Sequence, residues 1–250
     1  MPYEELKRKI EDKRAKAGIV GLGYVGLPLA MAYVEAGYDV IGYDVDAAKI
    51  EKLVRGVSYI GDVSDDAVRS AVGGGRFTPT ATAEDLQGAD VIAICVPTPL
   101  KANKEPDMSF LTDTCRTLSR HLRPGQLVIV ESTVYPGATR GECLPLLEAG
   151  GLKVGKDFWL AFSPERVDPG NTRFPIKHIP TVVGGVDAAA TELAASFYKP
   201  VVTEVVPVST AEAAEMSKLL ENTYRAVNIA LVNELKIICH RMGSVSYTHL

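Results

Sequence analysis

The sequence has little cysteine and no paired cysteines of the C-x-x-C kind. Its 250 residues contain four cysteines, which lie far apart, at Cys95, Cys115, Cys143 and Cys239. This spacing argues against a structural zinc site and against a disulfide framework. We therefore expect no bound metal and a reducing, cytoplasmic setting.

The sequence also lacks a strong excess of charge of either sign. It has 27 Lys and Arg against 31 Asp and Glu, a formal net charge of −4. Without a global basic field, we expect no nucleic acid partner. With 46% hydrophobic and 23% charged residues, the composition is that of a folded globular protein and excludes collagen-like, coiled-coil and disordered chains.

One uncharged run is long enough to be mistaken for a membrane span. Residues 17–34 carry no charge over 18 positions, about the minimum length that crosses a bilayer. Four glycines and Pro28 divide this run into a strand, a tight turn and a helix. We therefore expect no association with a membrane.

Apolar, strand-like runs alternate with helical stretches along most of the chain. This alternation is typical of α/β proteins with a parallel sheet, and continuous Val and Ile runs indicate strands buried on both faces. The predicted strands are 17–20, 39–43, 91–96, 127–130, 158–162, 181–183 and 201–206. The predicted helices are 3–14, 25–36, 46–55, 64–71, 109–121, 138–149 and 187–198. The sequence therefore predicts a Rossmann-type, doubly wound, mostly parallel sheet.

From Ser209 to about Arg241 the pattern becomes that of one long connecting helix. No Gly or Pro interrupts it, and Ser209 or Thr210 is available as the N-cap. At 1.5 Å per residue this helix is about 45 to 50 Å long, more than a single domain needs. Its apolar surface predicts a homodimer in the full-length protein, and a further domain that covers this surface is the alternative.

A G-x-G-x-x-G sequence, Gly21-Leu-Gly-Tyr-Val-Gly26, follows the first predicted strand and opens a helix. This context is typical of dinucleotide binding. Gly21 permits the sharp turn, Gly23 lets the backbone approach a pyrophosphate, and Gly26 allows close packing of the helix. We expect the cofactor to contact Gly21, Gly23, Tyr24, Val25 and Gly26 at the amino end of that helix. A glycine turn without a nucleotide is the alternative.

Asp44 ends the second predicted strand, 23 residues after Gly21, where a ribose would lie. Its carboxylate accepts hydrogen bonds from ribose hydroxyls and repels a 2′-phosphate, which favours NAD over NADP. A strand-end cap for the following helix is the alternative role for Asp44.

The domain organisation follows from these elements. We expect residues 1–207, with the helix at 3–14, to form an NAD-binding Rossmann domain. Residues 208–243 are expected to be a long central helix that begins a substrate or dimerisation region. Residues 244–250 are expected to be a non-native tail, because one codon choice for the last six residues resembles a transposon end used in DNA libraries. A natural terminus is the alternative.

Other polar side chains follow strands or share a helix face. Ligands of doubly wound sheets bind at the carboxyl ends of the strands, where the sequence places Thr98 and Thr133. Lys218 and Asn222 are four residues apart on the long helix, so they share a face and can bind an oxygen whose negative charge grows during alcohol oxidation. The alternatives are ordinary turn chemistry for the two loops and a solvated face for the helix.

Several motifs occur together in the order found in one enzyme family. They are Gly21-Leu-Gly-Tyr-Val-Gly-Leu-Pro28, Val96-Pro-Thr-Pro99, Glu131-Ser-Thr-Val-Tyr-Pro-Gly137, Ser163-Pro-Glu-Arg166 with Pro169-Gly170, and Lys218-Leu-Leu-Glu-Asn-Thr-Tyr224. Through them the chain, up to about Gly243, resembles the UDP-glucose/GDP-mannose dehydrogenase family. Residues 163–170 and 179–185 look most like the bacterial UDP-N-acetylglucosamine 6-dehydrogenase branch.

The resemblance implies a four-electron oxidation of the C6 alcohol of a UDP-sugar, with UDP-N-acetylglucosamine as the best guess, to the uronic acid. Two NAD are consumed, and a cysteine carries a thiohemiacetal and then a thioester. Carried over by motif, Lys218 and Asn222 stabilise the C6 oxyanion, and Thr133 lies beside the nicotinamide. Glu165 acts as a general base, and Arg166 binds substrate or supports its loop through an ion pair.

The sequence departs from the family at the nucleophile. The family's catalytic cysteine sits in a glycine-rich segment beyond the long helix, and none of the four cysteines here has such flanks. Buried structural thiols are their common role. We therefore expect a C-terminally truncated fragment, itself inactive, of an active enzyme. The alternatives are a β-hydroxyacid dehydrogenase, which needs no cysteine, and a non-catalytic NAD-binding module.

Overall fold

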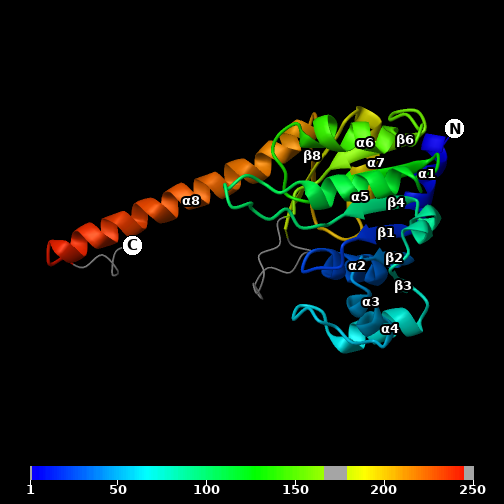
Figure 1. The fold of residues 1–250 in the computed structure, drawn as a ribbon, viewed down its shortest axis with the longest axis horizontal. Helices are drawn as coiled ribbons and strands as arrows, with labels where there is room; N and C mark the ends of the chain where they lie inside the picture. Colours follow the sequence, from blue (N-terminus) through cyan, green and yellow to red (C-terminus); the bar gives the residue numbers. More distant parts are fainter. Residues whose placement is uncertain (1, 166–178, 245–250) are drawn as a thin grey trace.

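The computed structural model describes residues 2–165 and 179–244. Within them, eight strands form one sheet in the order β3-β2-β1-β4-β5-β6-β7-β8, with helices on both faces (Figure 1). The strands are β1 (Ala17–Val20), β2 (Val40–Tyr43), β3 (Phe77–Thr80), β4 (Val91–Ile94), β5 (Gln126–Val130), β6 (Phe158–Phe162), β7 (Thr181–Gly185) and β8 (Val205–Pro207). The helices are α1 (Pro2–Glu11), α2 (Gly26–Glu35), α3 (Ala47–Val54), α4 (Asp65–Gly73), η1 (Ala83–Gly88), α5 (Ser109–Ser119), η2 (Thr139–Cys143), α6 (Leu144–Glu148), α7 (Ala188–Tyr198) and α8 (Ala211–Arg241).

The sheet is parallel from β3 to β6, and β7 is antiparallel to β6. β1 lies between β2 and β4, so the strand order reverses at the boundary between β1 and β4. Every residue of β1, β4, β5 and β6 is buried, because helices cover both faces and a hydrophobic cluster fills each side. The predicted doubly wound fold is confirmed.

Some element predictions need correction. β3 escaped the sequence analysis because Pro79 lies within it, and Pro is tolerated there since β3 is an edge strand. The strand predicted at 201–206 is β8, which covers only Val205–Pro207. Val201, which was predicted to begin this strand, lies instead in the turn after α7, and its apolar side chain packs into the core. The helix predicted at 138–149 opens with the π-helical η2, ahead of Pro145, which has no N–H for a helical bond.

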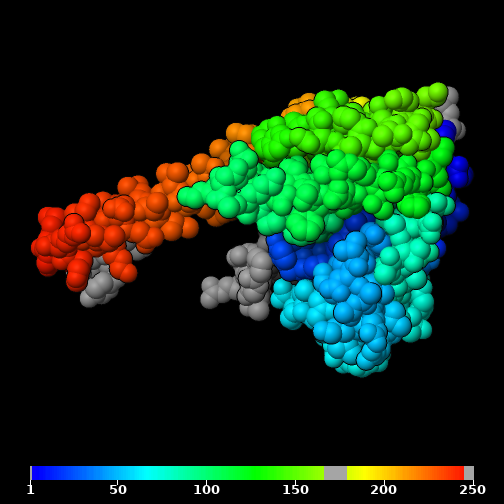
Figure 2. Space-filling model, in the orientation of Figure 1, coloured from blue at the N-terminus to red at the C-terminus, as the bar shows by residue number. Residues whose placement is uncertain are grey.

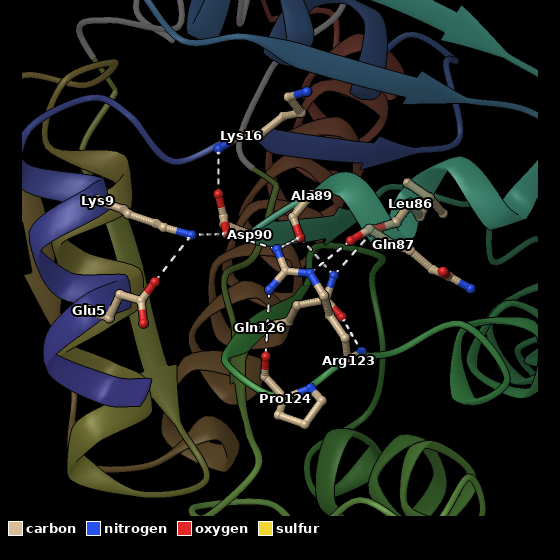
Figure 3. Close-up of polar contacts among 10 residues, drawn as sticks. All are labelled: Glu5, Lys9, Lys16, Leu86, Gln87, Ala89, Asp90, Arg123, Pro124 and Gln126. Atoms are coloured by element: carbon tan, nitrogen blue, oxygen red, sulfur yellow. Dashed lines mark hydrogen bonds and ion pairs between the residues drawn. The ribbon is translucent and has the colours of Figure 1, made fainter. Parts of the chain in front are cut away.

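A polar network ties the amino-terminal edge of the sheet together (Figure 3). Asp90, just before β4, accepts hydrogen bonds from the backbone N–H of Lys16 at 3.0 Å, Nζ of Lys9 at 3.0 Å and Nη2 of Arg123 at 2.8 Å. Burial alone would raise the pKa of Asp90, but these three donors hold it below its usual value. α1, which confirms the predicted amino-terminal helix, is therefore held to the sheet by charge as well as by apolar packing.

α8 is one continuous helix of 31 residues. Its first turns pack on the body through the buried Ala211, Ala214 and Glu215, and the rest extends away from the body (Figures 1 and 2). Thr210 caps it by accepting a hydrogen bond from the N–H of Ala213 at 3.2 Å. The predicted long helix is confirmed. Among the helices that the structure describes, none has the length and apolar character needed to cross a membrane.

We predict that Asp90→Asn lowers the free energy of unfolding by about 2 to 3 kcal/mol at pH 7, because Lys9 and Arg123 lose a buried anionic partner. The pKa of Asp90 is depressed in the folded state. Its contribution is therefore complete above the ordinary value of 3.8 and is lost as the pH falls through the folded-state value. Urea titrations of both proteins from neutral to acidic pH should show a difference that shrinks on acidification.

Asp66→Asn is the matched control, because the Asp66 side chain is 90% exposed and pairs with Arg69 at the surface. Its loss should stay below about 1 kcal/mol. Equal losses for the two variants, or a loss for Asp90→Asn that does not change with pH, would contradict the role given to Asp90.

Candidate functional site

A cleft of about 600 Å³ opens at the carboxyl edge of the sheet. This volume is within the range of about 300 to 1,000 Å³ that is usual for cofactor and substrate sites. Its walls come from the turn between β1 and α2, the ends of β2, β4 and β5, one face of α5, and the first part of α8. The cleft therefore lies where the strand order reverses, which is the expected ligand position in a doubly wound sheet.

The glycine turn forms the centre of the cleft. Gly21 has a φ of +89°, and a Cβ placed on it would lie 2.8 Å from the carbonyl oxygen of Cys95. A Cβ on Gly26 would lie 1.9 Å from the carbonyl oxygen of Gly21, so only glycine lets α2 begin here. A Cβ on Gly23 would meet no atom within 4 Å. This open space, with the amino end of α2 beside it, suits a pyrophosphate.

Tyr24 and Val25, the other two turn residues predicted to bind the cofactor, also line the cleft. The Tyr24 side chain is 57% exposed. Tyr59, which the sequence analysis did not single out, holds the turn from below, because its hydroxyl donates a hydrogen bond to the carbonyl oxygen of Leu22 at 2.7 Å. Four of the five predicted positions of the turn thus line the cleft, whereas Gly26 is buried at the start of α2 and does not line it.

Asp44 lies at the end of β2 and lines the cleft. Its carboxylate accepts hydrogen bonds from the N–H of Leu22 at 2.9 Å, the N–H of Asp46 at 3.0 Å and Nζ of Lys49 at 3.0 Å. The cap of α3 is Asp46, which accepts from the N–H of Ala48 at 3.0 Å. Asp44 is therefore not the cap itself, and it joins the glycine turn to α3 at the side of the cleft where a ribose would lie. Lys49 was missed because the sequence spacing gives it no special position.

The loops after β4 and β5 meet at the next part of the cleft wall. The Oγ1 of Thr98 donates a hydrogen bond to the carbonyl oxygen of Thr133 at 2.8 Å, and the Oγ of Ser132 donates one to the carbonyl oxygen of Val96 at 2.7 Å. Both predicted threonines line the cleft. Parallel neighbouring strands thus bring Thr98 and Thr133 together, although they are 35 residues apart.

Lys218 and Glu165 line the same cleft from its far side. The Nζ of Lys218 donates a hydrogen bond to the backbone carbonyl oxygen of Glu165. Asn222 lies one turn further along α8, is exposed, and accepts a hydrogen bond from Arg225. The structure thus brings Thr133, Glu165 and Lys218 together and places Asn222 outside the cleft lining.

A buried carboxylate that the sequence analysis missed fixes α8 in this position. Glu215 is fully buried and accepts hydrogen bonds from the N–H of Gly137 at 2.5 Å and the N–H of Thr139 at 2.8 Å. It lies three residues before Lys218, so it joins the helix that carries Lys218 to the segment that follows Thr133. The spacing of Ala211, Ala214, Glu215 and Lys218 marks one helix face, and an acidic residue on that face was the available signal.

Glu131, at the end of β5, is 4% exposed and lines the cleft. Burial is the main cause that raises its pKa to about 8, and the negative charge of Glu165 raises it further. The Tyr198 hydroxyl donates a hydrogen bond to its Oε1. The neighbouring Cys95 thiol is also buried, and burial raises its pKa well above the usual value.

Some of the sequence predictions fall outside the described residues. Arg166, Pro169 and Gly170 lie there, and so do residues 245–250 of the expected non-native tail at 244–250.

Family models match both parts of the chain. One described as the NAD binding domain of the UDP-glucose/GDP-mannose dehydrogenase family matches residues 15–202, and one described as the central domain of that family matches residues 212–247.

Characterised relatives agree with these matches. The UDP-N-acetyl-D-mannosamine dehydrogenase of Pyrococcus horikoshii is 39% identical over 91% of this chain and 54% of its own length. The UDP-N-acetyl-D-glucosamine 6-dehydrogenase of Pseudomonas aeruginosa is 38% identical over 92% of this chain and 54% of its own length. The chain thus spans about half the length of the curated relatives it matches.

The fold gives the same result. The solved structure of the UDP-D-ManNAc dehydrogenase from Pyrococcus horikoshii matches with a TM-score of 0.85, and the match covers 91% of this chain and 55% of that one. The NAD-binding match alone extends over more than half of the sequence. The chain therefore belongs to the UDP-glucose/GDP-mannose dehydrogenase family, and its doubly wound domain is an NAD-binding domain.

Proposed function

We propose that the protein containing this chain is an NAD-dependent UDP-sugar 6-dehydrogenase, which oxidises the C6 alcohol of a UDP-sugar to the uronic acid for polysaccharide biosynthesis. The observation that carries this proposal is the placement of Thr133, Glu165 and Lys218 around one cleft that contains the glycine turn. The family resemblance implies a role for each of the three: Thr133 beside the nicotinamide, Glu165 as general base and Lys218 as the partner of the C6 oxyanion.

UDP-N-acetylglucosamine is the proposed substrate. Residues 163–170 and 179–185 resemble the branch that oxidises this sugar, and a relative of that name aligns over 92% of the chain. UDP-N-acetyl-D-mannosamine appears in the name of another relative, so both sugars belong in the test.

The residues at the cleft have separate tasks in this proposal. Bound NAD supplies the hydride acceptor. The glycine turn and the amino end of α2 hold the pyrophosphate, and Asp44 accepts hydrogen bonds from the ribose hydroxyls. Thr98 and Thr133 orient the nicotinamide end, because the bond between them fixes both loops.

The reacting groups lie on the opposite wall. The ammonium of Lys218 stabilises the oxyanion that forms at C6, where a fixed positive charge in a partly buried site has most effect. Asn222 is proposed to assist from the same helix, one turn further along. Glu165 accepts a proton as a general base.

The four cysteines of the chain do not fit the nucleophile that the family resemblance implies. Cys95, Cys115 and Cys143 are buried, and a raised pKa keeps the Cys95 thiol protonated. Cys239 lies 21 residues beyond Lys218 on α8, about 30 Å along the helix axis. We therefore propose that this chain binds NAD but does not by itself complete the oxidation.

The proposed setting is a cytoplasmic homodimer. All four cysteines are free, which is the usual state in a reducing compartment. The part of α8 beyond the body exposes apolar side chains, among them Val227, Ile229 and Leu231, which support a dimer of the full-length protein. The matches to residues 15–202 and 212–247 support a division into an NAD-binding domain over 1–207 and a central helix over 208–243.

A β-hydroxyacid dehydrogenase and a non-catalytic NAD-binding module are the alternative functions. Family membership and the placement of Glu165 and Lys218 at the cleft favour the UDP-sugar enzyme over both. A screen of hydroxyacids against UDP-sugars with the protein encoded at the natural gene locus, with NADH absorbance as the signal, separates all three.

We predict that the protein encoded at the natural gene locus, read on through the codon for Ser244, forms two NADH per UDP-sugar oxidised. The 250-residue chain should bind NAD and form no NADH. In the natural protein, Lys218→Ala should lower kcat by about 10²- to 10³-fold, because the oxyanion loses its charge partner. Turnover is measured by NADH absorbance and NAD binding by calorimetry.

Lys156→Ala is the matched control, since Lys156 is an exposed lysine just before β6, at the edge of the sheet opposite the cleft. It should leave kcat unchanged. Robust turnover by the 250-residue chain, or by the Lys218→Ala variant of the natural protein, would count against the proposal.

We also predict that Gly23→Ala weakens NAD binding by about 5- to 150-fold without lowering the melting temperature. The added Cβ meets no protein atom within 4 Å but occupies the space proposed for the pyrophosphate, and such overlap costs about 1 to 3 kcal/mol. Gly73→Ala is the control, because its Cβ also meets no atom within 4 Å and Gly73 lies on α4. Equal NAD affinities of the two variants would rule out this position for the pyrophosphate.

A further inference from the structure

Glu131 is a buried carboxyl group that the proposed reaction does not use. Its side chain lines both the main cleft and a second, smaller cavity of about 30 Å³. Ser163, Glu165, Thr181 and Tyr198 also line the second cavity, which has room for about one water molecule with polar partners. The carboxyl group of Glu131 therefore adjoins a space beside the main cleft that can hold one water molecule.

Groups from four elements face Glu131. They are Cys95 after β4, Tyr198 on α7, Tyr33 on α2 and Glu165 after β6. Burial raises the pKa values of Tyr33, Tyr198 and Cys95 well above their usual ranges, so these three groups are uncharged at neutral pH. Glu165 is the like charge in the group, and it opposes ionisation of Glu131.

Glu131 lies on the nicotinamide side of the cleft. A dinucleotide crosses the carboxyl edge at the strand-order reversal, between β1 and β4. Asp44 at the end of β2 marks the adenosine half, so the ends of β4 and β5, with Glu131, face the nicotinamide half. The nicotinamide ring carries a positive charge in NAD⁺ and none in NADH. This charge appears and disappears beside a carboxyl group that has little water around it.

We propose that Glu131 is a proton site coupled to the redox state of the cofactor: NAD⁺ binding drives its proton to solvent, and NADH lets the proton return. The opposite charge of the oxidised ring favours the carboxylate, and by linkage the carboxylate favours NAD⁺ over NADH. The proposal rests on NAD binding by this chain, and its role in catalysis rests on the proposed function.

The coupling has a chemical use in alcohol oxidation. Each oxidation of an alcohol carbon transfers a hydride to NAD⁺ and releases one proton, so the ring loses its charge as the proton appears. Glu165, the proposed general base, takes that proton from the alcohol and passes it to the Glu131 carboxylate, which lines the same small cavity and no longer faces a positive ring. Glu131 then becomes a neutral acid. When NAD⁺ replaces NADH, the proton leaves for solvent. Atoms and charge balance over the cycle.

The test is calorimetric titration of the 250-residue chain with NAD⁺ and with NADH, in two buffers that differ in ionisation enthalpy. If NAD⁺ lowers the pKa of Glu131 from about 8 by about one unit, about half a proton leaves per NAD⁺ bound near pH 7.5. NADH should release none. The ratio of NAD⁺ affinity to NADH affinity should rise by about tenfold between pH 6 and pH 9.

Glu131→Gln should abolish both the proton release and the pH dependence of this ratio. Glu51→Gln is the control, because the Glu51 side chain is 65% exposed on α3, and it should behave as the parent chain. Tyr198→Phe keeps the carboxyl group but removes the donor that lowers the pKa of Glu131. It should therefore still release a proton, with a midpoint at higher pH. A purely structural role for Glu131 would move none of these midpoints.

Three results would overturn the proposal. NAD⁺ binding without proton release in the parent chain would overturn it and leave the proposed function standing. Proton release that persists in Glu131→Gln would assign it to another group. Failure of the chain to bind NAD⁺ at all would overturn the proposed function as well.

Discussion

The contact between the glycine turn and the end of β4 sets the geometry of the whole site. The backbone of Gly21 comes so near Cys95 that a side chain has no room, and Gly26 starts α2 directly against the carbonyl oxygen of Gly21. These two close backbone contacts place the amino end of α2 beside the carboxyl end of β1. The amino end of α2 with its dipole, the open space over Gly23 and the carboxylate of Asp44 therefore face one cleft.

A buried acidic side chain helps to hold the second wall of the cleft in place. Glu215 anchors α8 to the N–H groups of Gly137 and Thr139, and a surface ion pair of Arg140 with Glu212 at 2.9 Å lies beside it. Since Thr133 and Lys218 lie on the two segments that Glu215 joins, this contact contributes to their separation, together with the packing of Ala211 and Ala214. Residues of the NAD-binding domain and of the long helix thus belong to one site, although they are separate in sequence.

The strands of the sheet were predictable from sequence where both of their faces are buried. β1, β4, β5 and β6 read as continuous apolar runs because both of their faces are covered, whereas β3 is an edge strand with Pro79 inside it and gives no such signal. The glycine turn was predictable because each glycine has a separate role: Gly21 and Gly26 allow close backbone contacts, and Gly23 leaves open space. Glu215 and Glu131 were not identified as site residues, because their burial depends on the elements that pack around them. The position of Glu215 on the helix face that carries Ala211 and Ala214 was the one signal for it in the sequence.

The direction of β7 has a consequence for the small cavity behind Glu131. Because β7 runs antiparallel to β6, Gly184 pairs with Phe162, and the start of β7 returns to the edge where Glu165 stands. Ile179 and Thr181, just before and at the start of β7, therefore line that cavity together with Glu165. The reversal of this one strand thus supplies a wall that a strand parallel to β6 would have begun at the opposite edge of the sheet.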